Sequence, residues 1–300
     1  MTTKRGYTLQ PAEPRLAPSL ALQFPESHRA HAPPFARLWL ERERLAVGLV
    51  LVVAFIQMLV YIFLLPPWQH YDEPSHFEYA WLIANQGGLR PGEPNPVLRR
   101  EVMGSMLAHE FYRDLAPPDL LGDGRSASIG ISQFGGVPAY YLFISIPLRL
   151  VRHLDVTTQL YVARGASGLL FLLTALIAAA LTRDLTPSGH PLRWVVPLVM
   201  VLIPSFADLM TAVNDDVGAT FAFSLVLWAA ARLLRFGLDL WRVLWLVVAS
   251  VAAVLTKNTA GVAVALAPVA LLLAVWLRVR ARWWWFAALT LLSLAVVVVA

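Results

Sequence analysis

Long apolar stretches constrain this chain more than any other feature of its sequence. The first, Leu45–Leu65, carries no charged residue, and about 20 apolar residues are what an α-helix needs to cross the hydrocarbon core of a bilayer. Later stretches of similar character cover 160–182, 192–210, 217–236, 241–256, 259–277 and 283–300. Lipid offers the backbone no hydrogen-bond partners, so spans of this composition are helical. The sequence therefore predicts an all-α polytopic membrane protein with about seven transmembrane helices.

The overall composition excludes several other classes of protein. Apolar residues make up 58% of the chain and charged residues 14%, whereas soluble domains have roughly 45–50% and about 25%. The chain has no cysteine, which excludes disulfides, thiolate metal sites and a cysteine nucleophile. The net charge is +5, but the basic residues lie between apolar stretches and not on one face. We therefore expect no nucleic-acid partner.

The arginines between the apolar stretches predict which side of the membrane each connection faces. Short connections rich in Arg and Lys stay in the cytoplasm. Arginine groups precede or join the predicted spans at Arg37/Arg42/Arg44, Arg183/Arg193, Arg232/Arg235/Arg242 and Arg278/Arg280/Arg282. With seven spans all of these groups are cytoplasmic, whereas a further span at Val137–Val151 would place the later three outside. We therefore expect a cytoplasmic N-terminus and an extracytoplasmic loop at 66–159, with an interfacial helix at 137–151.

Two parts of unequal length follow from this topology. Residues 1–44 are rich in proline before the first span, so we expect a largely disordered cytoplasmic tail. Residues 45–300 form one transmembrane module. The last apolar stretch reaches Ala300 with no polar residue after Trp285, and we therefore expect the chain to be a piece of a longer protein.

The long loop opens with a helix signal that carries ionisable side chains. Asp72 suits a helix N-cap, Pro74 suits the first turn and Gly87 suits the C-terminal stop. Asp72, Glu73 and His76 thus begin a short juxtamembrane helix just outside the first span. Two interpretations stay open here: Asp72 and Glu73 serve only as a cap and a charge favoured by the helix dipole, or they carry chemistry.

Other polar residues are predicted on the same side of the membrane. Asp215 and Lys257 lie in external connections, and Arg164 lies near the outer end of the second span. Ionisable groups beside lipid usually face a cavity or a partner. The structural alternatives are a cap for Asp215 or Asp216, snorkelling to the headgroups for Lys257, and a phosphate-headgroup anchor for Arg164.

The order of these motifs resembles the N-terminal module of the GT-C class of polytopic glycosyltransferases, which includes protein O-mannosyltransferases and aminoarabinose transferases. The matching elements are Tyr71-Asp72-Glu73-Pro74-Ser75-His76-Phe77, Gly87-Gly88-Leu89-Arg90-Pro91, Val137-Pro138-Ala139-Tyr140-Tyr141-Leu142, Arg164, Asn214-Asp215-Asp216 and Leu255-Thr256-Lys257-Asn258-Thr259-Ala260. Many relatives have His-Pro-Pro or Gln-Pro-Pro before the paired tyrosines, whereas this chain has Gly136-Val137-Pro138. The Asp-Glu-Pro-x-His-Phe form also resembles a less understood branch of predicted membrane proteins with the same layout.

The resemblance implies transfer of a sugar at the outer face of a bacterial plasma membrane. The donor would be a polyprenyl-phosphate sugar in the membrane lipid, and the acceptor a hydroxyl of a glycan, lipid or protein. Asp72 would be the catalytic base and Glu73 a supporting carboxylate. His76 would contact substrate, Arg164 and Lys257 would face the donor phosphate, and Asp215 would bind acceptor. A divalent metal ion between Asp72 and Asp215 is left open.

Two other functions remain as alternatives. A transporter or flippase for lipid-linked sugar would use the same intramembrane charges along a substrate path, and broken spans in corresponding halves of the chain would favour it. The sequence has no evident internal repeat in residues 45–300. The second alternative is a non-catalytic membrane subunit that binds lipid-linked sugar.

Overall fold

The computed structural model describes residues 34–88, 93–114 and 129–279, and every regular element within these ranges is helical. The elements are α1 (Pro34–Leu64), α2 (Glu73–Gln86), α3 (Pro96–Ala108), α4 (Ala139–Leu150), α5 (Val156–Leu185), α6 (Leu192–Leu202), α7 (Pro204–Thr211), α8 (Asp215–Phe236), α9 (Leu240–Thr256), η1 (Asn258–Gly261) and α10 (Val262–Val279). The predicted all-α fold is confirmed for the described residues. Helix α1 includes the last residues of the expected tail, while residues 1–33 lie outside the described ranges.

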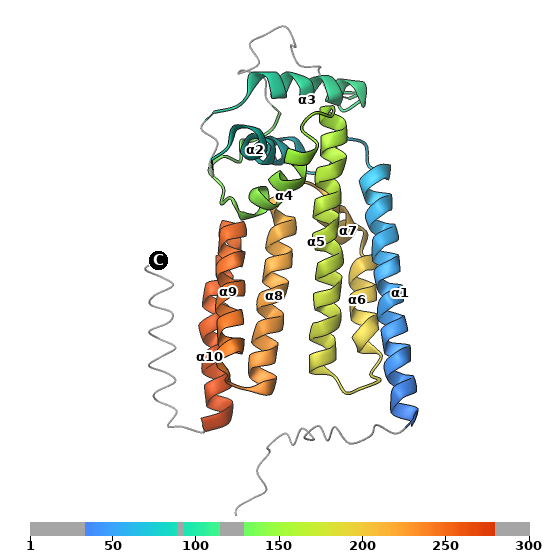
Figure 1. Ribbon diagram of the computed structural model, residues 1–300, viewed down its shortest axis with the longest axis vertical. Helices are drawn as coiled ribbons and strands as arrows, with labels where there is room; N and C mark the ends of the chain where they lie inside the picture. Colours follow the sequence, from blue (N-terminus) through green and yellow to red (C-terminus); the bar gives the residue numbers. More distant parts are fainter. Residues whose placement is uncertain (1–33, 89–92, 115–128, 280–300) are drawn as a thin grey trace, which may run out of the picture.

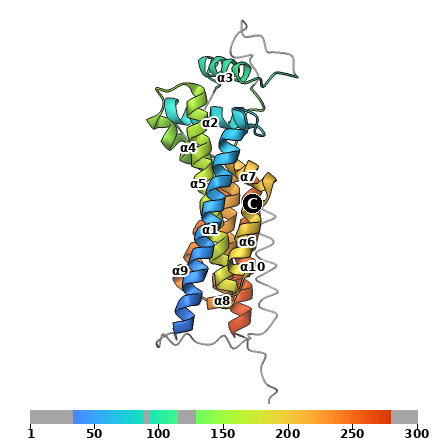
Figure 2. The same ribbon diagram turned by 90° about the vertical axis from the view of Figure 1, so that its right-hand side faces the viewer.

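The helices form a bundle with a helical layer at one end. Helices α1, α5, α6, α8, α9 and α10 run side by side, and α2, α3 and α4 lie beyond one end of them (Figure 1). Figure 2 shows the same separation after a quarter turn. Helix α5 packs against α1, α6 and α8, and α8 packs against α9 and α10. We call the end with α2, α3 and α4 the loop end, and the end with Arg193, Arg232 and Arg242 the arginine end.

Several helices of the described chain are long and apolar enough to cross a membrane. Four qualify individually, at Arg42–Leu64, Val156–Leu185, Asp215–Phe236 and Asn258–Leu277, and a bent pair, α6 with α7, makes up to five. Helix α9 has 17 residues, which at about 1.5 Å per residue is short for a core about 30 Å thick. The expected span at 283–300 lies outside the described residues, so the count of seven stays a prediction.

The stretch 192–210 is not the single straight span that its composition predicts. Helix α6 ends at Leu202, α7 begins at Pro204, and the two axes differ by 71°. Ile203 between them is extended, at φ −71° and ψ 115°. Pro204 explains the break, because a proline disfavours helical geometry in the residue before it and has no N–H to donate.

Buried side chains attach the loop end to the bundle. Trp68 is fully buried, and its indole Nε1 donates to Ser105 Oγ of α3 at 2.8 Å. Ser105 Oγ in turn lies 2.6 Å from Thr157 Oγ1 of α5. The expected interfacial helix at 137–151 corresponds to α4, which packs against α2 and α5. The turn before α2, and helices α3, α4 and α5, are therefore joined into one unit.

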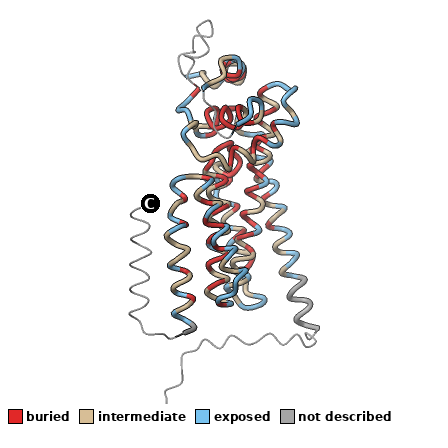
Figure 3. The backbone as a smooth tube through the Cα atoms, turned by 60° about the vertical axis from the view of Figure 1, so that its left-hand side comes forward, coloured by how far each residue is buried: buried red, intermediate tan, exposed pale blue. Residues whose placement is uncertain are grey.

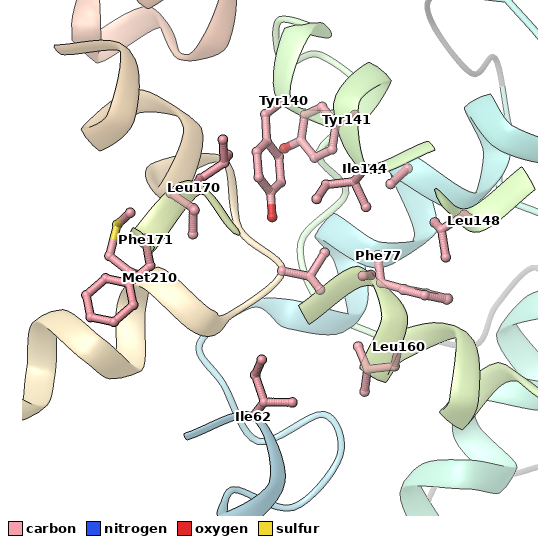
Figure 4. Close-up of a cluster of buried hydrophobic side chains, with 14 of the residues drawn as sticks. Ile62, Phe77, Tyr140, Tyr141, Ile144, Leu148, Leu160, Leu170, Phe171 and Met210 are labelled. Carbon is pink, nitrogen blue, oxygen red and sulfur yellow. The ribbon is translucent and has the colours of Figure 1, made fainter. Parts of the chain in front are cut away.

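A continuous hydrophobic core runs from the loop end into the bundle. Figure 4 shows Phe77 of α2 and Ile144 and Leu148 of α4 close to Leu160 of α5. Buried residues concentrate in α2, α4 and the inward faces of the long helices, and the outward faces of the bundle are exposed (Figure 3). The exposed faces carry many large apolar side chains, which is what helices with lipid around them require.

The arginine end is held by an ion pair between the first span and α6. Arg193 Nη1 lies 2.7 Å from Glu43 Oε2, and the two side chains are 8% and 11% exposed. Arg193 Nη2 also donates to the carbonyls of Arg183 and Thr186 at the end of α5. The arginine group Arg183/Arg193 therefore meets the N-terminal arginine group, through Glu43 between Arg42 and Arg44, at one end of the bundle. Whether this end is cytoplasmic stays a prediction.

Candidate functional site

The turn before α2 holds Asp72 in an unusual conformation. Asp72 has φ 52° and ψ 13°, in the left-handed region, which few non-glycine residues adopt and where Asp and Asn are enriched. Its carboxylate forms no hydrogen bond with the N–H groups of the α2 first turn, and its carbonyl accepts from Ser75 Oγ at 2.9 Å. The side chain does not serve as the N-cap that the sequence pattern suggests, so the half-buried carboxylate is available for another role.

Glu73 forms the most buried ion pair in the described chain, with Arg164 of α5. Both side chains are 0% exposed, and the contact is bidentate, with Arg164 Nε 2.8 Å and Nη2 2.6 Å from the Glu73 carboxylate oxygens. Arg164 also donates to the carbonyls of Ile62, Leu65 and Pro66, at 2.9, 2.9 and 3.0 Å. All five N–H donors of Arg164 are therefore engaged, and none is directed at an open surface.

The Glu73–Arg164 pair has a clear structural effect. Arg164 satisfies backbone carbonyls at the C-terminal end of α1, where a helix has no N–H groups of its own to offer. Glu73 Oε1 also accepts from the Val213 N–H before α8, at 3.3 Å. One buried pair thus connects the end of α1, the start of α2, the first third of α5 and the turn before α8.

Lys257 and the two aspartates of α8 form a second charged group at the loop end. Lys257 Nζ lies 2.9 Å from Asp215 Oδ1 and 2.6 Å from Asp216 Oδ1. Asn214, and not either aspartate, is the N-cap of α8, because its side chain accepts from the Asp216 N–H. The Lys257 side chain is 25% exposed, and its contact with two carboxylates replaces the snorkelling that composition alone would allow.

His76 joins this charged group from α2. Its Nδ1 is 2.8 Å from the hydroxyl of Tyr141 in α4. Burial is the main cause that lowers the His76 pKa to about 4, and the positive charge of Lys257 lowers it further, against the opposing effect of Asp72 and Asp216. His76 is therefore neutral at pH 7. Burial, reinforced by Asp215, raises the Tyr141 pKa, so the phenol keeps its proton.

Close packing of α4 and α9 on α8 determines where these side chains meet. The Tyr140 hydroxyl lies 2.7 Å from Ser167 Oγ of α5 and accepts from the Asn214 N–H at 3.0 Å. At Gly218 of α8, a Cβ atom would come within 2.6 Å of Thr256 Cγ2 and 3.0 Å of the Tyr140 ring. Only glycine allows this approach, which brings α4 and the end of α9 together beside Asp215.

The structure thus divides the residues predicted from sequence into two groups. The first is the polar cluster, which we define as Asp72, His76, Tyr141, Asp215, Asp216 and Lys257. The second is Glu73 with Arg164, which lies in the interior and does not face the cluster's exposed side. Tyr141 is an addition to the predicted set, and the sequence signal for it was the paired tyrosines at 140–141.

Sequence reasoning missed two further polar pairs at the loop end. Glu78 and Arg99 form a buried ion pair between α2 and α3, with Arg99 Nε 2.7 Å from Glu78 Oε1. His70 Nδ1 lies 2.8 Å from Asp208 Oδ1 of α7, but the ring orientation forms no hydrogen bond and burial lowers the His70 pKa. We therefore treat His70 as neutral. The only sequence signal for these pairs was a charged residue within an apolar pattern.

The possible metal site can be tested on the donor groups present. Among the residues that the structure describes, no group of three or more His, Cys, Asp or Glu side chains gathers closely enough to hold a metal ion. Lys257 Nζ already neutralises the Asp215 and Asp216 carboxylates. The donor set does not fit a metal, and no chemical step below is routed through one.

No protein-family model matches the chain, and neither does any curated protein or solved structure. The resemblance to the GT-C class therefore rests on the sequence motifs, and the function must be argued from the chemistry of the polar cluster.

Proposed function

We propose that the protein is a membrane glycosyltransferase that moves a sugar from a polyprenyl-phosphate-linked donor to an acceptor hydroxyl, at the loop end of the bundle. The observation that carries the proposal is the polar cluster, in which the uncapped carboxylate of Asp72 and the ammonium group of Lys257 both lie close enough to His76 to shift its pKa, beside apolar spans. A transfer of this kind needs a base for the acceptor and a cation for the leaving phosphate in the same place.

The proposed reaction assigns a role to each charge. The Asp72 carboxylate takes the proton of the acceptor hydroxyl as the acceptor oxygen bonds to the anomeric carbon of the sugar. The bond from that carbon to the phosphate oxygen breaks, and the lipid phosphate leaves with the electron pair. Lys257 stabilises the departing charge with an N–H donor that Asp215 and Asp216 do not occupy. His76 is neutral and hydrogen-bonded to Tyr141, and it orients substrate without adding charge.

Glu73 and Arg164 act as positioning residues in this proposal. Their mutual contacts, and the carbonyls that Arg164 holds, account for all the hydrogen-bond donors of the guanidinium. A phosphate contact by Arg164 would require breaking a fully buried pair, which costs several kcal/mol. Glu73 fixes the turn that presents Asp72, the residue immediately before it in the chain.

A transfer assay on the full-length protein in vesicles that contain a polyprenyl-phosphate sugar tests the proposal. The Asp72→Asn variant should lose about 10²–10⁴-fold in turnover, the usual contribution of a positioned base, while donor binding stays close to wild type. Asp114→Asn, an exposed carboxylate at the loop end, is the matched control and should leave turnover unchanged. Full transfer activity in Asp72→Asn would remove Asp72 as the base.

One observation supports the transporter alternative. Helices α6 and α7 form a broken pair with a 71° bend, and discontinuous helices often line transport paths. Asp208 of α7 is 48% exposed within this apolar pair. Movement of a labelled lipid-linked sugar across sealed vesicles with no acceptor, unaffected by Asp72→Asn and lost in Asp208→Asn, would favour transport. Donor binding without either activity would favour the non-catalytic subunit.

A further inference from the structure

A cavity of about 510 Å³ lies at the arginine end of the bundle, where α8 ends and α9 begins. It is remote from the polar cluster, which lies at the other end of the same two helices (Figure 1). Its walls include Trp228 and Arg232 of α8, and Trp241, Arg242 and Trp245 of α9. Two guanidinium groups and three indoles therefore surround one space.

Arg232 is held in place by contacts with its Nε atom and its guanidinium face, while its terminal nitrogens stay available. Asp184 Oδ2 accepts from Trp228 Nε1 at 2.9 Å and lies 3.7 Å from Arg232 Nε. The guanidinium carbon lies 5.2 Å from the centre of the Trp228 ring, within the range of a cation–π contact. In the part of the chain that the structure describes, no protein group occupies the terminal nitrogens of Arg232. Asp184 thus orients the Arg232 guanidinium group and leaves its terminal N–H donors available.

Arg242 is fixed in a similar way. Its Nη1 donates to the carbonyls of Phe236 and Gly237, both at 2.8 Å, where α8 ends and its last carbonyls need donors. Its Nε and Nη2 have no hydrogen-bond partner within the described ranges. Asp239, the acidic residue that also lines the cavity, is exposed and offsets one of the two positive charges. Asp184 beside Arg232 offsets the other positive charge. The site therefore has no net charge, and it presents unoccupied N–H groups on four nitrogens, Nη1 and Nη2 of Arg232 and Nε and Nη2 of Arg242, directed by fixed side chains.

The apolar side of the cavity continues along the surface of α9. Trp241 and Trp245 are one turn apart and are 67% and 64% exposed. Tryptophan is enriched where a helix leaves the hydrocarbon core for the headgroup layer. The cavity thus presents N–H donors for an anion where α8 ends, and from there an apolar path runs along the outer surface of α9.

We propose that this cavity binds the phosphodiester headgroup of an anionic phospholipid, with one acyl chain along Trp241 and Trp245. Arginine pairs with phosphate oxygens through two parallel hydrogen bonds, and basic pockets between membrane helices take anionic headgroups. The proposal does not depend on the function of the polar cluster. Its residues belong to the other end of α8 and α9, and lipid binding can be measured without any turnover.

The test is native mass spectrometry of the full chain in detergent, titrated with phosphatidylglycerol and, separately, with phosphatidylcholine of the same acyl chains. We expect phosphatidylglycerol to be retained at least about tenfold more strongly. The double variant Arg232→Gln/Arg242→Gln should bind it about thirtyfold more weakly, since each basic residue near a membrane surface adds a factor of about five. Arg113→Gln/Arg152→Gln removes two exposed arginines at the loop end and should leave retention unchanged.

A second variant and a soluble probe complete the experiment. Arg232→Lys/Arg242→Lys keeps both charges but loses the planar fork, so it should retain phosphatidylglycerol at an intermediate level, and it provides the measurement if the glutamine variant does not fold. Glycerol 3-phosphate supplies a phosphate anion, as a monoester, without acyl chains and should not displace the lipid. Equal retention of both lipids by the wild type, wild-type retention by the glutamine or lysine variant, or displacement by glycerol 3-phosphate would overturn the proposal.

Discussion

The buried Glu73–Arg164 pair provides the sharpest test of how the loop end is attached to the bundle. Glu73→Gln keeps the size of the side chain but leaves the Arg164 charge without its counterion in a site that is 0% exposed. Breaking a buried pair by removing one partner costs about 3–5 kcal/mol. We therefore expect the free energy of unfolding of Glu73→Gln to fall by about that amount.

Arg164→Gln should cost more than Glu73→Gln. It leaves the Glu73 carboxylate unpaired and also removes the donors to the carbonyls of Ile62, Leu65 and Pro66. A buried acceptor without a partner costs about 1–3 kcal/mol. The double variant restores electrical neutrality, so its loss should be smaller than the sum of the single losses by about 2 kcal/mol, within the range of directly contacting pairs.

Reversible unfolding of the purified protein in mixed micelles, followed by far-ultraviolet circular dichroism, measures these differences. Glu110→Gln is the matched control, because Glu110 and Arg113 form an exposed pair, and exposed pairs contribute about 0–1 kcal/mol. If Glu73→Gln unfolds within about 1 kcal/mol of the wild type, or if the single losses add up in the double variant, the pair does not hold the loop end. Loss of donor binding in a stable Arg164→Gln would instead restore a direct phosphate role.

Three further predictions concern packing, pH and topology. Gly218→Val should lower the free energy of unfolding by about 1–3 kcal/mol through overpacking, because its Cβ would meet Thr256. Gly165→Ala, where the space is open, should instead raise it by up to about 1 kcal/mol in the same unfolding assay, because alanine favours a helix interior over glycine. The His76 pKa falls from 6.5 to about 4 on folding, so the unfolded state binds more protons than the folded state between pH 6.5 and 4. Up to about 3 kcal/mol of stability should therefore be lost as the pH drops through this range. His76→Gln should flatten this part of the profile of stability against pH. A single cysteine placed at Asp114 should react with an impermeant maleimide on intact cells; labelling only after the cells are opened would reverse the predicted orientation.

The helices could be predicted from the sequence because their signals are local. Leu45–Leu65 needs only its composition to indicate a helix, and α2 ends at Gln86 with Gly87 following, as the pattern predicts. The break at Ile203 also had a local signal, Pro204, but the apolar composition of 192–210 favours a single span when it is considered alone. Local physics therefore indicates where helices form, and proline indicates where they break.

The partners of the polar residues could not be predicted in the same way. Glu73 and Arg164 are 91 residues apart, and no periodicity or cap signal relates positions so distant. Asp72 illustrates the opposite problem, since its sequence context is that of an N-cap and the structure gives it a left-handed backbone with no capping bond. In both cases tertiary contacts decide the role, and a single sequence contains no record of them.

The pairing pattern also constrains any chemistry at the loop end. Two cations, Arg164 and Lys257, were equivalent candidates for a donor phosphate when only the topology was known. Arg164 is fully occupied in the interior, whereas Lys257 is 25% exposed and uses two of its three N–H donors on Asp215 and Asp216, which leaves one for a ligand. An incoming phosphate would accept from the third donor, but it would share the positive charge of the ammonium group with Asp215 and Asp216. If Lys257 contacts the phosphate, Asp215→Asn or Asp216→Asn should tighten binding of a phosphate-bearing lipid. If Arg164 contacted the phosphate instead, these substitutions would leave that binding unchanged.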